Sequence, residues 1–264
     1  MGTILDRIMR AKREELDITA RLCPLVDVRA ALADAPPVRP FESALAGGGP
    51  IKLIAEVKKA SPSKGIIRAD FRPLDIARDY QRHGATCLSV LTDREFFQGS
   101  LDILRSVRET VALPVLRKDF VLDVYQVLEA RAVGADAVLL IAECLRGDQL
   151  RRLYDAIREL DMTPLVELHK SENLERVLDL GATLVGVNNR DLETFKVDLD
   201  RTIRIRRQVP AGCTVVAESG IQHRRDVKRL EEAHVHAMLV GERLMASRDI
   251  GTAVDTLLGS SHSV

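Results

Sequence analysis

Two charged residues stand where a buried strand is expected to end. Residues 54–65 read IAEVKKASPSKG, and the apolar start of this stretch suits the core of a sheet. Glu56 and Lys58 are two positions apart, so in a strand their side chains project from the same face. Because burying an unpaired charge costs several kcal/mol, the pair predicts a cleft where carboxylates and ammonium groups meet and transfer protons.

Further polar residues suited to acid–base chemistry follow the later apolar runs. They are Lys118, Asp119, Glu143, Glu167, Asn188, Arg190, Glu218 and Ser219. A single charged residue at a strand end is usually entering solvent, and we keep that interpretation for Lys59, Lys64, Asp119 and Glu143. The others recur at the same end of successive runs, which favours one shared acid–base site.

The apolar runs themselves recur eight times. They lie at residues 52–58, 87–93, 114–120, 137–143, 163–169, 184–190, 214–220 and 237–242, and they alternate with stretches of helical periodicity. Near-continuous apolar strands are typical of a parallel sheet covered by helices. Eight such units predict an α/β fold, a (β/α)8 TIM barrel over residues 46–264, with its chemistry at the carboxyl ends of the strands. An open doubly wound sheet is the alternative, but no G-x-G-x-x-G turn follows the first run.

The first 45 residues do not follow this alternation. Residues 3–22 have a helical pattern with Thr3 as a candidate N-cap, and residues 33–41, ADAPPVRPF, predict a stiff connection. Residues 1–45 are too short for a domain of their own. We therefore expect an N-terminal helical extension packed over one end of the barrel, with a disordered tail as the alternative.

Glycines at the last two runs indicate an anion site. Gly220 and Gly241 each stand between an apolar run and a helical pattern. Backbone N–H groups at a helix N-terminus favour anions, and the loops after the seventh and eighth strands of such barrels commonly hold phosphate. Glycines that only permit tight turns are the alternative, but their occurrence at both of these strands favours a phosphate.

The overall composition argues against several classes of function. Lys plus Arg equal Asp plus Glu, at 39 each, so no global field favours nucleic acid or an anionic membrane. The four cysteines are far apart, and no Cys or His spacing is typical of a metal site. No apolar run approaches the length of a membrane helix, and the N-terminus is unlike a signal peptide. We expect a cytoplasmic protein that binds no metal, membrane or nucleic acid.

Two other residues near the predicted site have simpler interpretations. Cys144 follows the fourth run with no histidine in an obvious pairing position, which predicts a packed thiol rather than a nucleophile. His169 follows the fifth run, and we expect it at the surface.

Taken in order, several motifs resemble those of one family, the indole-3-glycerol phosphate synthases of tryptophan biosynthesis. The motifs are IAEVKKASPSKG, LRKDF, LVEL, GVNNRDL, AESGI and LVGE, and the resemblance extends over essentially the whole chain. It implies a (β/α)8 barrel with an extra N-terminal segment. It also implies closure of an indole ring from 1-(2-carboxyphenylamino)-1-deoxyribulose 5-phosphate, with release of carbon dioxide and water and without a cofactor or metal.

The resemblance also implies which residues form the site. The catalytic set is Glu56, Lys58, Lys118, Glu167, Asn188 and Ser219. Ser61, Gly220 and Gly241 match phosphate-side positions, and Phe97, Phe120 and Leu139 match an apolar pocket for the anthranilate ring. The substrate-binding set also includes Arg190, Glu218, Leu239 and Glu242.

Glu242 departs from part of the family, because some members carry serine at this position. A carboxylate that faced the phosphate would repel it. We therefore expect the Glu242 side chain to point towards solvent or a cation such as Arg243, while the Glu242 backbone N–H donates to phosphate.

The implied chemistry accounts for these residue types. Attack of the ring carbon on the ketone builds negative charge on the carbonyl oxygen, and Lys118 is similar to the acid that the family places there. Dehydration then needs a second acid and a base, for which Lys58 and either Glu56 or Glu167 are candidates. Burial lowers a lysine pKa and a nearby carboxylate raises it, and the sequence leaves that balance open.

Two rival functions differ in their expected residues. A phosphoribosylanthranilate isomerase is expected to end its first strand with cysteine, where this chain has Glu56 and Lys58. A non-catalytic barrel in a tryptophan-pathway assembly would not need Lys58, Lys118 and Glu167. The expected partner is a phosphorylated small-molecule substrate, with other enzymes of the tryptophan pathway as candidate protein partners.

Overall fold

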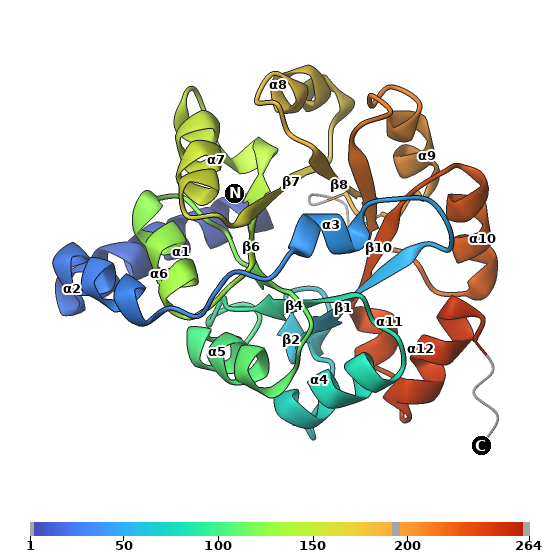
Figure 1. Ribbon diagram of the computed structural model, residues 1–264, viewed down its shortest axis with the longest axis horizontal. Coiled ribbons are helices and arrows are strands. Elements are labelled where there is room, and N and C mark those ends of the chain that lie inside the picture. The colour runs from blue at the N-terminus through green and yellow to red at the C-terminus, as the bar shows by residue number, and fades with distance from the viewer. Residues whose placement is uncertain (1–2, 192–195, 261–264) are drawn as a thin grey trace.

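Eight parallel strands close into a barrel in the computed structural model, which describes residues 3–191 and 196–260 (Figure 1). In chain order the strands are β1 (Lys52–Val57), β4 (Cys87–Leu91), β5 (Val115–Lys118), β6 (Ala137–Ile141), β7 (Thr163–Leu168), β8 (Leu184–Asn188), β9 (Thr214–Glu218) and β10 (Ala237–Val240). The last strand returns to the first, with Lys52 opposite Ala237. The predicted (β/α)8 barrel is confirmed.

Helices follow the strands and cover the outside of the barrel (Figure 1). They are α4 (Pro73–Arg82), α5 (Leu101–Thr110), α6 (Val124–Ala132), α7 (Gln149–Glu159), α8 (Leu174–Leu178), α9 (Asp200–Arg206), α10 (Arg224–Glu232), α11 (Glu242–Met245) and α12 (Ile250–Leu258). Local signals set several of their starts. Ser100, Asp123 and Asp249 accept backbone N–H groups as N-caps, and α4 begins with a proline, whose fixed φ suits the first helical turn.

Shorter elements complete the chain. A small hairpin of β2 (Ala60–Ser61) and β3 (Gly65–Ile66) lies between β1 and α4. Single 3-10 turns occur at η1 (Ala31–Asp34), η2 (Ala142–Cys144) and η3 (Ser171–Asn173). The hairpin matters for the site because it carries Ser61 to the carboxyl end of the barrel.

The inside of the barrel holds its own apolar core. Ile54, Leu116 and Leu165 are buried there with Phe41 and Leu45 of the short helix α3 (Phe41–Leu45). The same cluster includes the first residues of β8 and β10, which lie at the amino end of the barrel. Helix α3 therefore closes that end, and in Figure 1 it lies in front of the strands.

The segment before β1 reaches both ends of the barrel. Helix α1 (Ile4–Leu22) begins with the expected Thr3 cap, and its residues Ile4, Leu5 and Ile8 line the pocket at the carboxyl ends of the strands. Helix α2 (Leu25–Ala30) packs on α6, and α3 lies at the opposite end. The expectation that this segment covers one end is therefore wrong in part, and most of its described residues are helical rather than a disordered tail.

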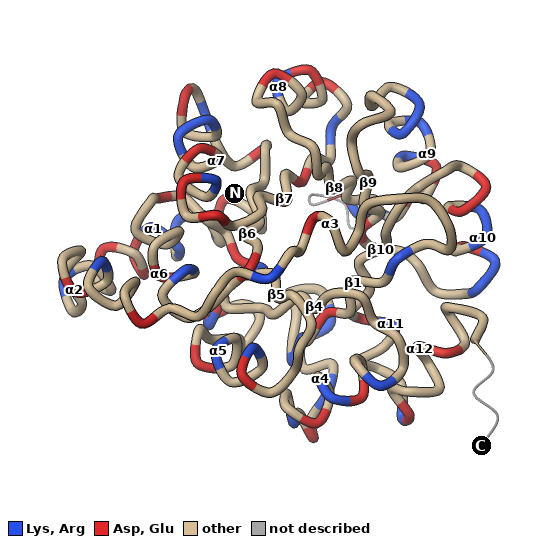
Figure 2. Tube along the Cα trace, in the orientation of Figure 1, with Lys and Arg blue, Asp and Glu red and all other residues tan. Residues whose placement is uncertain are grey.

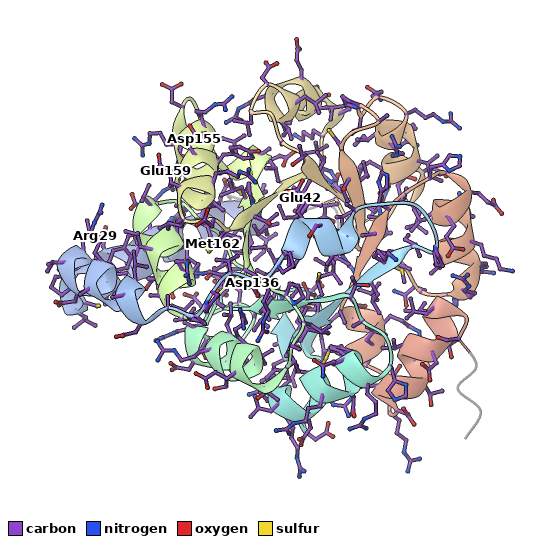
Figure 3. The ribbon with its side chains drawn as sticks, viewed as in Figure 1. Arg29, Glu42, Asp136, Asp155, Glu159 and Met162 are labelled. Atoms are coloured by element: carbon purple, nitrogen blue, oxygen red, sulfur yellow. The ribbon has the colours of Figure 1, made fainter. Side chains whose placement is uncertain are left out.

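The connection between α2 and α3 is tied to the amino end of the barrel by Asp136 (Figure 3). The buried Asp136 carboxylate accepts the backbone N–H of Arg39 at 2.6 Å and that of Val115 at 2.8 Å, and it pairs with Arg108 at 3.0 Å. These contacts satisfy a carboxylate that would otherwise be costly to bury. They also explain why a stiff stretch can run across the barrel without a helix or strand of its own.

Charges of both signs alternate over the outer helices, while the strands are mostly uncharged (Figure 2). This distribution agrees with the formal net charge of zero. In the part of the chain that the structure describes, no helix is long and apolar enough to cross a membrane.

Candidate active site

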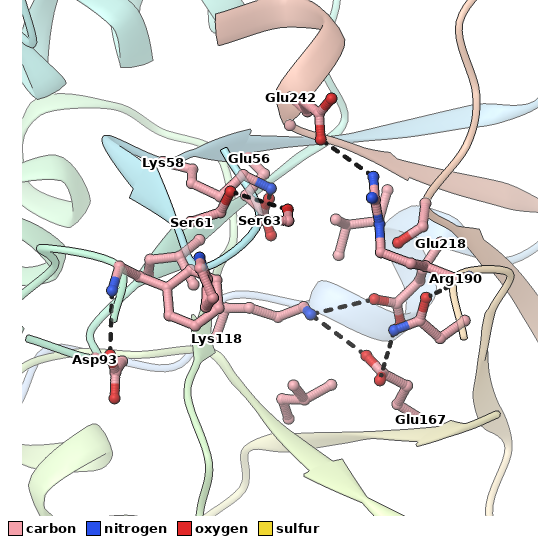
Figure 4. Close-up of a pocket in the computed structure, with 18 of the residues that line it drawn as sticks. Glu56, Lys58, Ser61, Ser63, Asp93, Lys118, Glu167, Arg190, Glu218 and Glu242 are labelled. Atoms are coloured by element: carbon pink, nitrogen blue, oxygen red, sulfur yellow. Dashed lines mark hydrogen bonds and ion pairs between the residues drawn. The ribbon is translucent and has the colours of Figure 1, made fainter. Parts of the chain in front are cut away.

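A pocket opens at the carboxyl ends of the strands, where the sequence predicted the chemistry (Figure 4). It brings every residue of the predicted site together. The predicted residues that line it are Glu56, Lys58, Ser61, Phe97, Lys118, Phe120, Leu139, Glu167, Asn188, Arg190, Glu218, Ser219, Gly220, Leu239, Gly241 and Glu242. Residues that are remote in the sequence meet here because all eight strands point their carboxyl ends the same way.

Lys118, at the end of β5, places its ammonium group at the centre of the pocket. Its Nζ atom lies 3.3 Å from Glu167 Oε2 and 3.3 Å from Glu218 Oε2 (Figure 4). Burial alone would lower the pKa of Lys118, but the negative charge carried by the group of Glu167, Glu218 and Glu56 outweighs burial and holds that pKa above its usual value. The balance that the sequence left open therefore favours the charged ammonium form.

Glu218, at the end of β9, is a carboxyl group in the opposite situation. Burial raises its pKa well above the usual range, and the neighbouring Glu167 carboxylate raises it further, against the opposing effect of Lys118. The site accommodates this side chain because β8 has no side chain at Gly186, where a Cβ atom would collide with Glu218 Oε1. Asn188 Nδ2 donates to Glu167 Oε1 at 3.1 Å and so fixes the second carboxyl group.

Glu56 and Lys58, the pair that opened the sequence analysis, form an ion pair with Oε2 and Nζ 2.6 Å apart. Burial would raise the pKa of Glu56, but Lys58 and Lys118 outweigh that effect and hold it below the usual value. Gly241 leaves room for this carboxylate, since a Cβ atom there would collide with Glu56 Oε2. The charges that end β1 are therefore paired inside the pocket, as their spacing predicted.

An apolar wall lines the part of the pocket next to β4, β5 and β6. The rings of Phe97 and Phe120 lie with centroids 6.4 Å apart, and Leu139 of β6 adds to them. The Asp93 carboxylate accepts the N–H groups of Phe96 at 2.8 Å and Phe97 at 3.2 Å, which fixes the loop that carries Phe97. Sequence reasoning missed the α1 residues Ile4, Leu5 and Ile8 in the lining.

Lys12 of α1 is a buried residue that the sequence analysis also missed. Its ammonium group lies 2.9 Å from Asp93 Oδ2, 2.9 Å from Asp119 Oδ1 and 2.7 Å from Glu15 Oε2. Asp119 is only 4% exposed, so the expectation that it enters solvent is wrong. The only sequence signal is a lysine and a glutamate three residues apart on a helix, which does not reveal the two distant aspartates.

Ser219 and Gly220 follow β9 with unusual backbone angles. Their φ values are +65° and +82°, and the left-handed region is uncommon for a serine. Asn189 Nδ2 donates to the Ser219 carbonyl at 3.2 Å and helps to hold this turn. The sequence pattern predicted a helix directly after Gly220. This prediction is wrong, because α10 begins only at Arg224. Gly241 does precede one as the N-cap of α11.

Glu242 has different partners from those expected. Its carboxylate lies 3.1 Å from Arg190 and 3.7 Å from Lys64, a residue of the loop between β2 and β3. Arg243 instead donates to the Gln222 carbonyl and to Ser247 Oγ. Pairing with a cation is therefore confirmed, but the predicted cation, Arg243, is wrong.

Other residues near the pocket have structural roles. Cys144 is a partly buried thiol, and burial raises its pKa to about 12, in agreement with a packed and unreactive group. His169 is 8% exposed rather than at the surface, with its ring beside Asn188 O and Arg201. Glu143 does not simply enter solvent, because its carboxylate accepts the N–H groups of His169 and Lys170. Over residues 3–191 and 196–260, no group of three or more His, Cys, Asp or Glu side chains is arranged to hold a metal ion.

The fold and the pocket define a class of protein, a (β/α)8-barrel enzyme whose strand ends present lysines and carboxyl groups to an enclosed site. The chain belongs to the indole-3-glycerol phosphate synthase family, whose sequence model matches residues 5–257.

Similar proteins of known name agree with this assignment. An indole-3-glycerol phosphate synthase from Polaromonas sp. (strain JS666 / ATCC BAA-500) is 52% identical, over 98% of this chain and 99% of the relative. Those from Rhodopirellula baltica and from Neisseria meningitidis serogroup C are each 49% identical, over 98% and 97% of this chain and 100% of each relative.

Comparison with solved structures supports the fold alone. A 3-hexulose-6-phosphate synthase has a TM-score of 0.64 at 16% identity, over 80% of this chain and 99% of that structure. An N-acetylmannosamine-6-phosphate 2-epimerase from Clostridium perfringens has a TM-score of 0.58 at 14% identity, over 73% and 86% of the two chains.

Proposed function

We propose that this chain is a carboxy-lyase of tryptophan biosynthesis, with indole-3-glycerol phosphate synthase activity. The substrate is 1-(2-carboxyphenylamino)-1-deoxyribulose 5-phosphate, which loses carbon dioxide and water as the indole ring closes. One observation carries the proposal beyond family membership. The Lys118 ammonium group lies at the centre of the pocket, 3.3 Å from two carboxyl groups, in a site that also holds a paired aromatic wall.

The division of the pocket supports one orientation of the substrate. The anthranilate ring packs against Phe97, Phe120 and Leu139, which lie next to β4, β5 and β6. The phosphate lies across the barrel, near Ser219, Gly220 and Gly241 at the ends of β9 and β10. In the closed strand order β6 and β10 are on opposite sides, so the ketone that links the two ends of the substrate lies near Lys118.

Ring closure depends on Lys118. Attack of the aromatic carbon on the ketone develops negative charge on the carbonyl oxygen, and a fixed ammonium group lowers the energy of that charge. Because burial is outweighed by the negative charge that the group of Glu167, Glu218 and Glu56 carries, the lysine holds its proton until the oxygen has become basic enough to take it. The attacking ring carbon then loses its carboxylate as carbon dioxide, which restores the aromatic ring.

Dehydration uses two further pairs of side chains, Lys58 with Glu56 and Glu167 with Glu218. Lys58 is the acid for the departing hydroxyl, because its ammonium lies at the pocket wall and Glu56 balances its charge at 2.6 Å. Glu167 is the base that takes the last proton, because Asn188 fixes its carboxylate. Glu218, whose pKa burial and Glu167 raise well above the usual value, holds a proton beside Glu167 that either group can return.

Turnover of the substrate tests this function directly. The chain contains no tryptophan, so no indole of the protein itself contributes to the absorbance and fluorescence of the product. Purified protein should convert the carboxyphenylamino substrate, and the Lys118→Ala protein, purified in the same way, controls for a contaminating host enzyme. Absence of turnover in folded wild-type protein would overturn the proposal.

Location and partners follow from the chemistry of the substrate. A phosphate dianion does not cross a lipid bilayer unaided, so the enzyme must share the compartment in which the substrate is made, which we take to be the cytoplasm. Association with other tryptophan-pathway enzymes would shorten the path of the intermediate. Co-purification of those enzymes with the tagged chain from its own host tests that part of the proposal.

A further inference from the structure

The Glu242 carboxylate lies at the rim of the pocket and joins three separate elements. It begins α11 directly after β10, while Arg190 follows β8 and Lys64 belongs to the β2–β3 hairpin. The distances are 3.1 Å to Arg190 and 3.7 Å to Lys64 (Figure 4 for Arg190). The side chains of Glu242 and Arg190 are 27% and 22% exposed, and that of Lys64 is 57% exposed, so an incoming ligand can reach all three.

The other cations that line the pocket have partners elsewhere. Lys58 pairs with Glu56, and Lys118 lies between Glu167 and Glu218. Arg243 donates to the carbonyl of Gln222. Arg190 differs in depth, because its partner Glu242 is 27% exposed at the rim of the pocket, whereas Glu56, Glu167 and Glu218 are at most 5% exposed. This rim lies at the end of β10, on the side opposite the aromatic wall.

Resting on the proposed function, we propose that Glu242 is an internal counter-anion that the substrate phosphate displaces. In the free protein the Glu242 carboxylate neutralises Arg190 and holds Lys64 near the pocket. A phosphate and a carboxylate repel each other at short range. When the phosphate arrives, Glu242 swings towards solvent, and Arg190 and Lys64 transfer their interactions to the phosphate.

This exchange sets how tightly the site binds small anions. Any phosphate must compete with Glu242 for the two cations, so free inorganic phosphate binds weakly. The complete substrate regains affinity through Phe97, Phe120 and the rest of the apolar wall. Glu242 therefore determines specificity, because it keeps the site empty of inorganic phosphate and available to a phosphate attached to an aromatic group.

Binding of inorganic phosphate to the full-length protein tests the exchange. Isothermal titration at low ionic strength compares wild type with Glu242→Gln, which keeps the shape and removes the charge. The Kd of phosphate should fall about tenfold in this variant, because phosphate no longer competes with a carboxylate for Arg190 and Lys64. Glu109→Gln, an exposed glutamate on α5, makes the same change in net charge and should shift this Kd by less than twofold.

Two further measurements separate exchange from other effects. In an Arg190→Gln background, the Glu242→Gln change should no longer tighten phosphate by more than twofold, because the nearer of the two contested cations is absent. Benzoate, a carboxylate without phosphate, should bind both proteins equally within twofold. If benzoate tightened and phosphate did not, the Glu242 position would belong to the substrate carboxylate, and the proposal would be overturned.

The outcomes also separate this proposal from the proposed function. If folded Glu242→Gln binds phosphate less than threefold more tightly, or more weakly, then Glu242 supports Arg190 and the exchange is overturned. Wild-type turnover of the carboxyphenylamino substrate, measured in the same preparation, would leave the function standing in that case. Tighter phosphate binding without any turnover would have the reverse meaning, since it supports the exchange and removes the function.

Discussion

The behaviour of Lys118 depends on the negative charge that the neighbouring group of Glu167, Glu218 and Glu56 carries. Burial would lower its pKa, but Glu167, Glu218 and Glu56 outweigh burial and hold the pKa above its usual value. Such an ammonium group is a poor proton donor to water at neutral pH and an effective stabiliser of negative charge on a nearby oxygen. Lys118 therefore first stabilises the negative charge on the substrate oxygen and only then transfers its proton to that oxygen.

Replacing Lys118 tests this role. Lys118→Ala should lower kcat by a factor on the order of 10² to 10⁴, the typical size of a positioned acid, with a smaller change in KM. Steady-state assays on the carboxyphenylamino substrate measure both constants. Lys228→Ala, at an exposed position of α10, is the matched control and should leave both unchanged. A Lys118→Ala protein that kept more than about a third of wild-type kcat would remove Lys118 from the acid role.

Glu218 predicts a dependence of stability on pH. Burial, then Glu167, raises its folded-state pKa well above the value of the unfolded chain, so folded Glu218 keeps a proton that unfolding releases. Its contribution to stability is fully present below the unfolded pKa and is lost as the pH rises towards the folded pKa. Within that window, wild type should lose about 1.4 kcal/mol per pH unit relative to Glu218→Gln, which cannot ionise.

Chemical denaturation of both proteins at a series of pH values above the unfolded glutamate pKa of about 4.3 measures this difference. Glu159→Gln, at an exposed position of α7, provides the control and should track wild type at each pH. Equal pH dependence of wild type and Glu218→Gln would mean that Glu218 is already ionised in the folded protein, and that it cannot hold the reserve proton assigned to it.

At the scale of elements, α1 is attached to the barrel by one buried charge. Lys12 bridges Asp93 after β4 and Asp119 after β5, each at 2.9 Å. Lys12→Met should destabilise the protein by about 3 to 5 kcal/mol, because it leaves the buried Asp93 carboxylate without the Lys12 cation and Asp119 with Arg117 alone. Denaturant unfolding measures this loss of free energy.

The same substitution should also affect substrate binding. Asp93 holds the loop of Phe97, and α1 contributes Ile4, Leu5 and Ile8 to the pocket. KM should therefore rise more than kcat falls. Arg13→Met removes an exposed charge from the next position of α1 and is expected to stay within about 0.5 kcal/mol of wild type. If Lys12→Met were as stable as that control, the ion cluster would not anchor the helix.

For the whole molecule, the amino end of the barrel contributes to stability without taking part in the catalysis assigned to the carboxyl end. Phe41 of α3 is fully buried at the amino end, far from the pocket in the strand direction. Phe41→Ala should cost about 3 to 5 kcal/mol in unfolding free energy and leave kcat/KM within about twofold at temperatures where the variant stays folded. Leu22→Ala, 81% exposed on α1, should change neither. A large loss of kcat/KM in folded Phe41→Ala would mean that the two ends are coupled.

Much of this arrangement could be predicted from the sequence, because it depends on local patterns. All eight apolar runs became strands, and the polar residues that ended them lie in one pocket. The Thr3 cap of α1 was also predicted from local signals. Once parallel strands are inferred, the residues at their carboxyl ends must converge, and no knowledge of individual contacts is needed.

What the sequence did not reveal depends on contacts between distant segments. Lys12 is separated from Asp93 and Asp119 by most of the first half of the chain, and no periodicity marks that meeting. The partner of Glu242 was misjudged for the same reason, because Arg243 is adjacent in sequence while Arg190 is adjacent in space. Gly186 appeared to be an ordinary strand residue until the Glu218 carboxylate was seen to occupy the space of its missing side chain.

The pairing of β10 with β1 has a consequence for how the chain is made. Strand β1 ends at Val57, and its partner β10 ends at Val240. Because translation proceeds at about 5–20 residues per second, the edge of β1 that pairs with β10 stays unpaired for on the order of 10 to 40 s after β1 has been synthesised. The burial of Phe41 is delayed as well, because its apolar cluster includes Leu184, Val216 and Ala237, which are synthesised later. An unpaired apolar edge is a template for association with other chains. The nascent chain is therefore most exposed to aggregation just before its last strand emerges, and a ribosome that stalls there would release a barrel that cannot close.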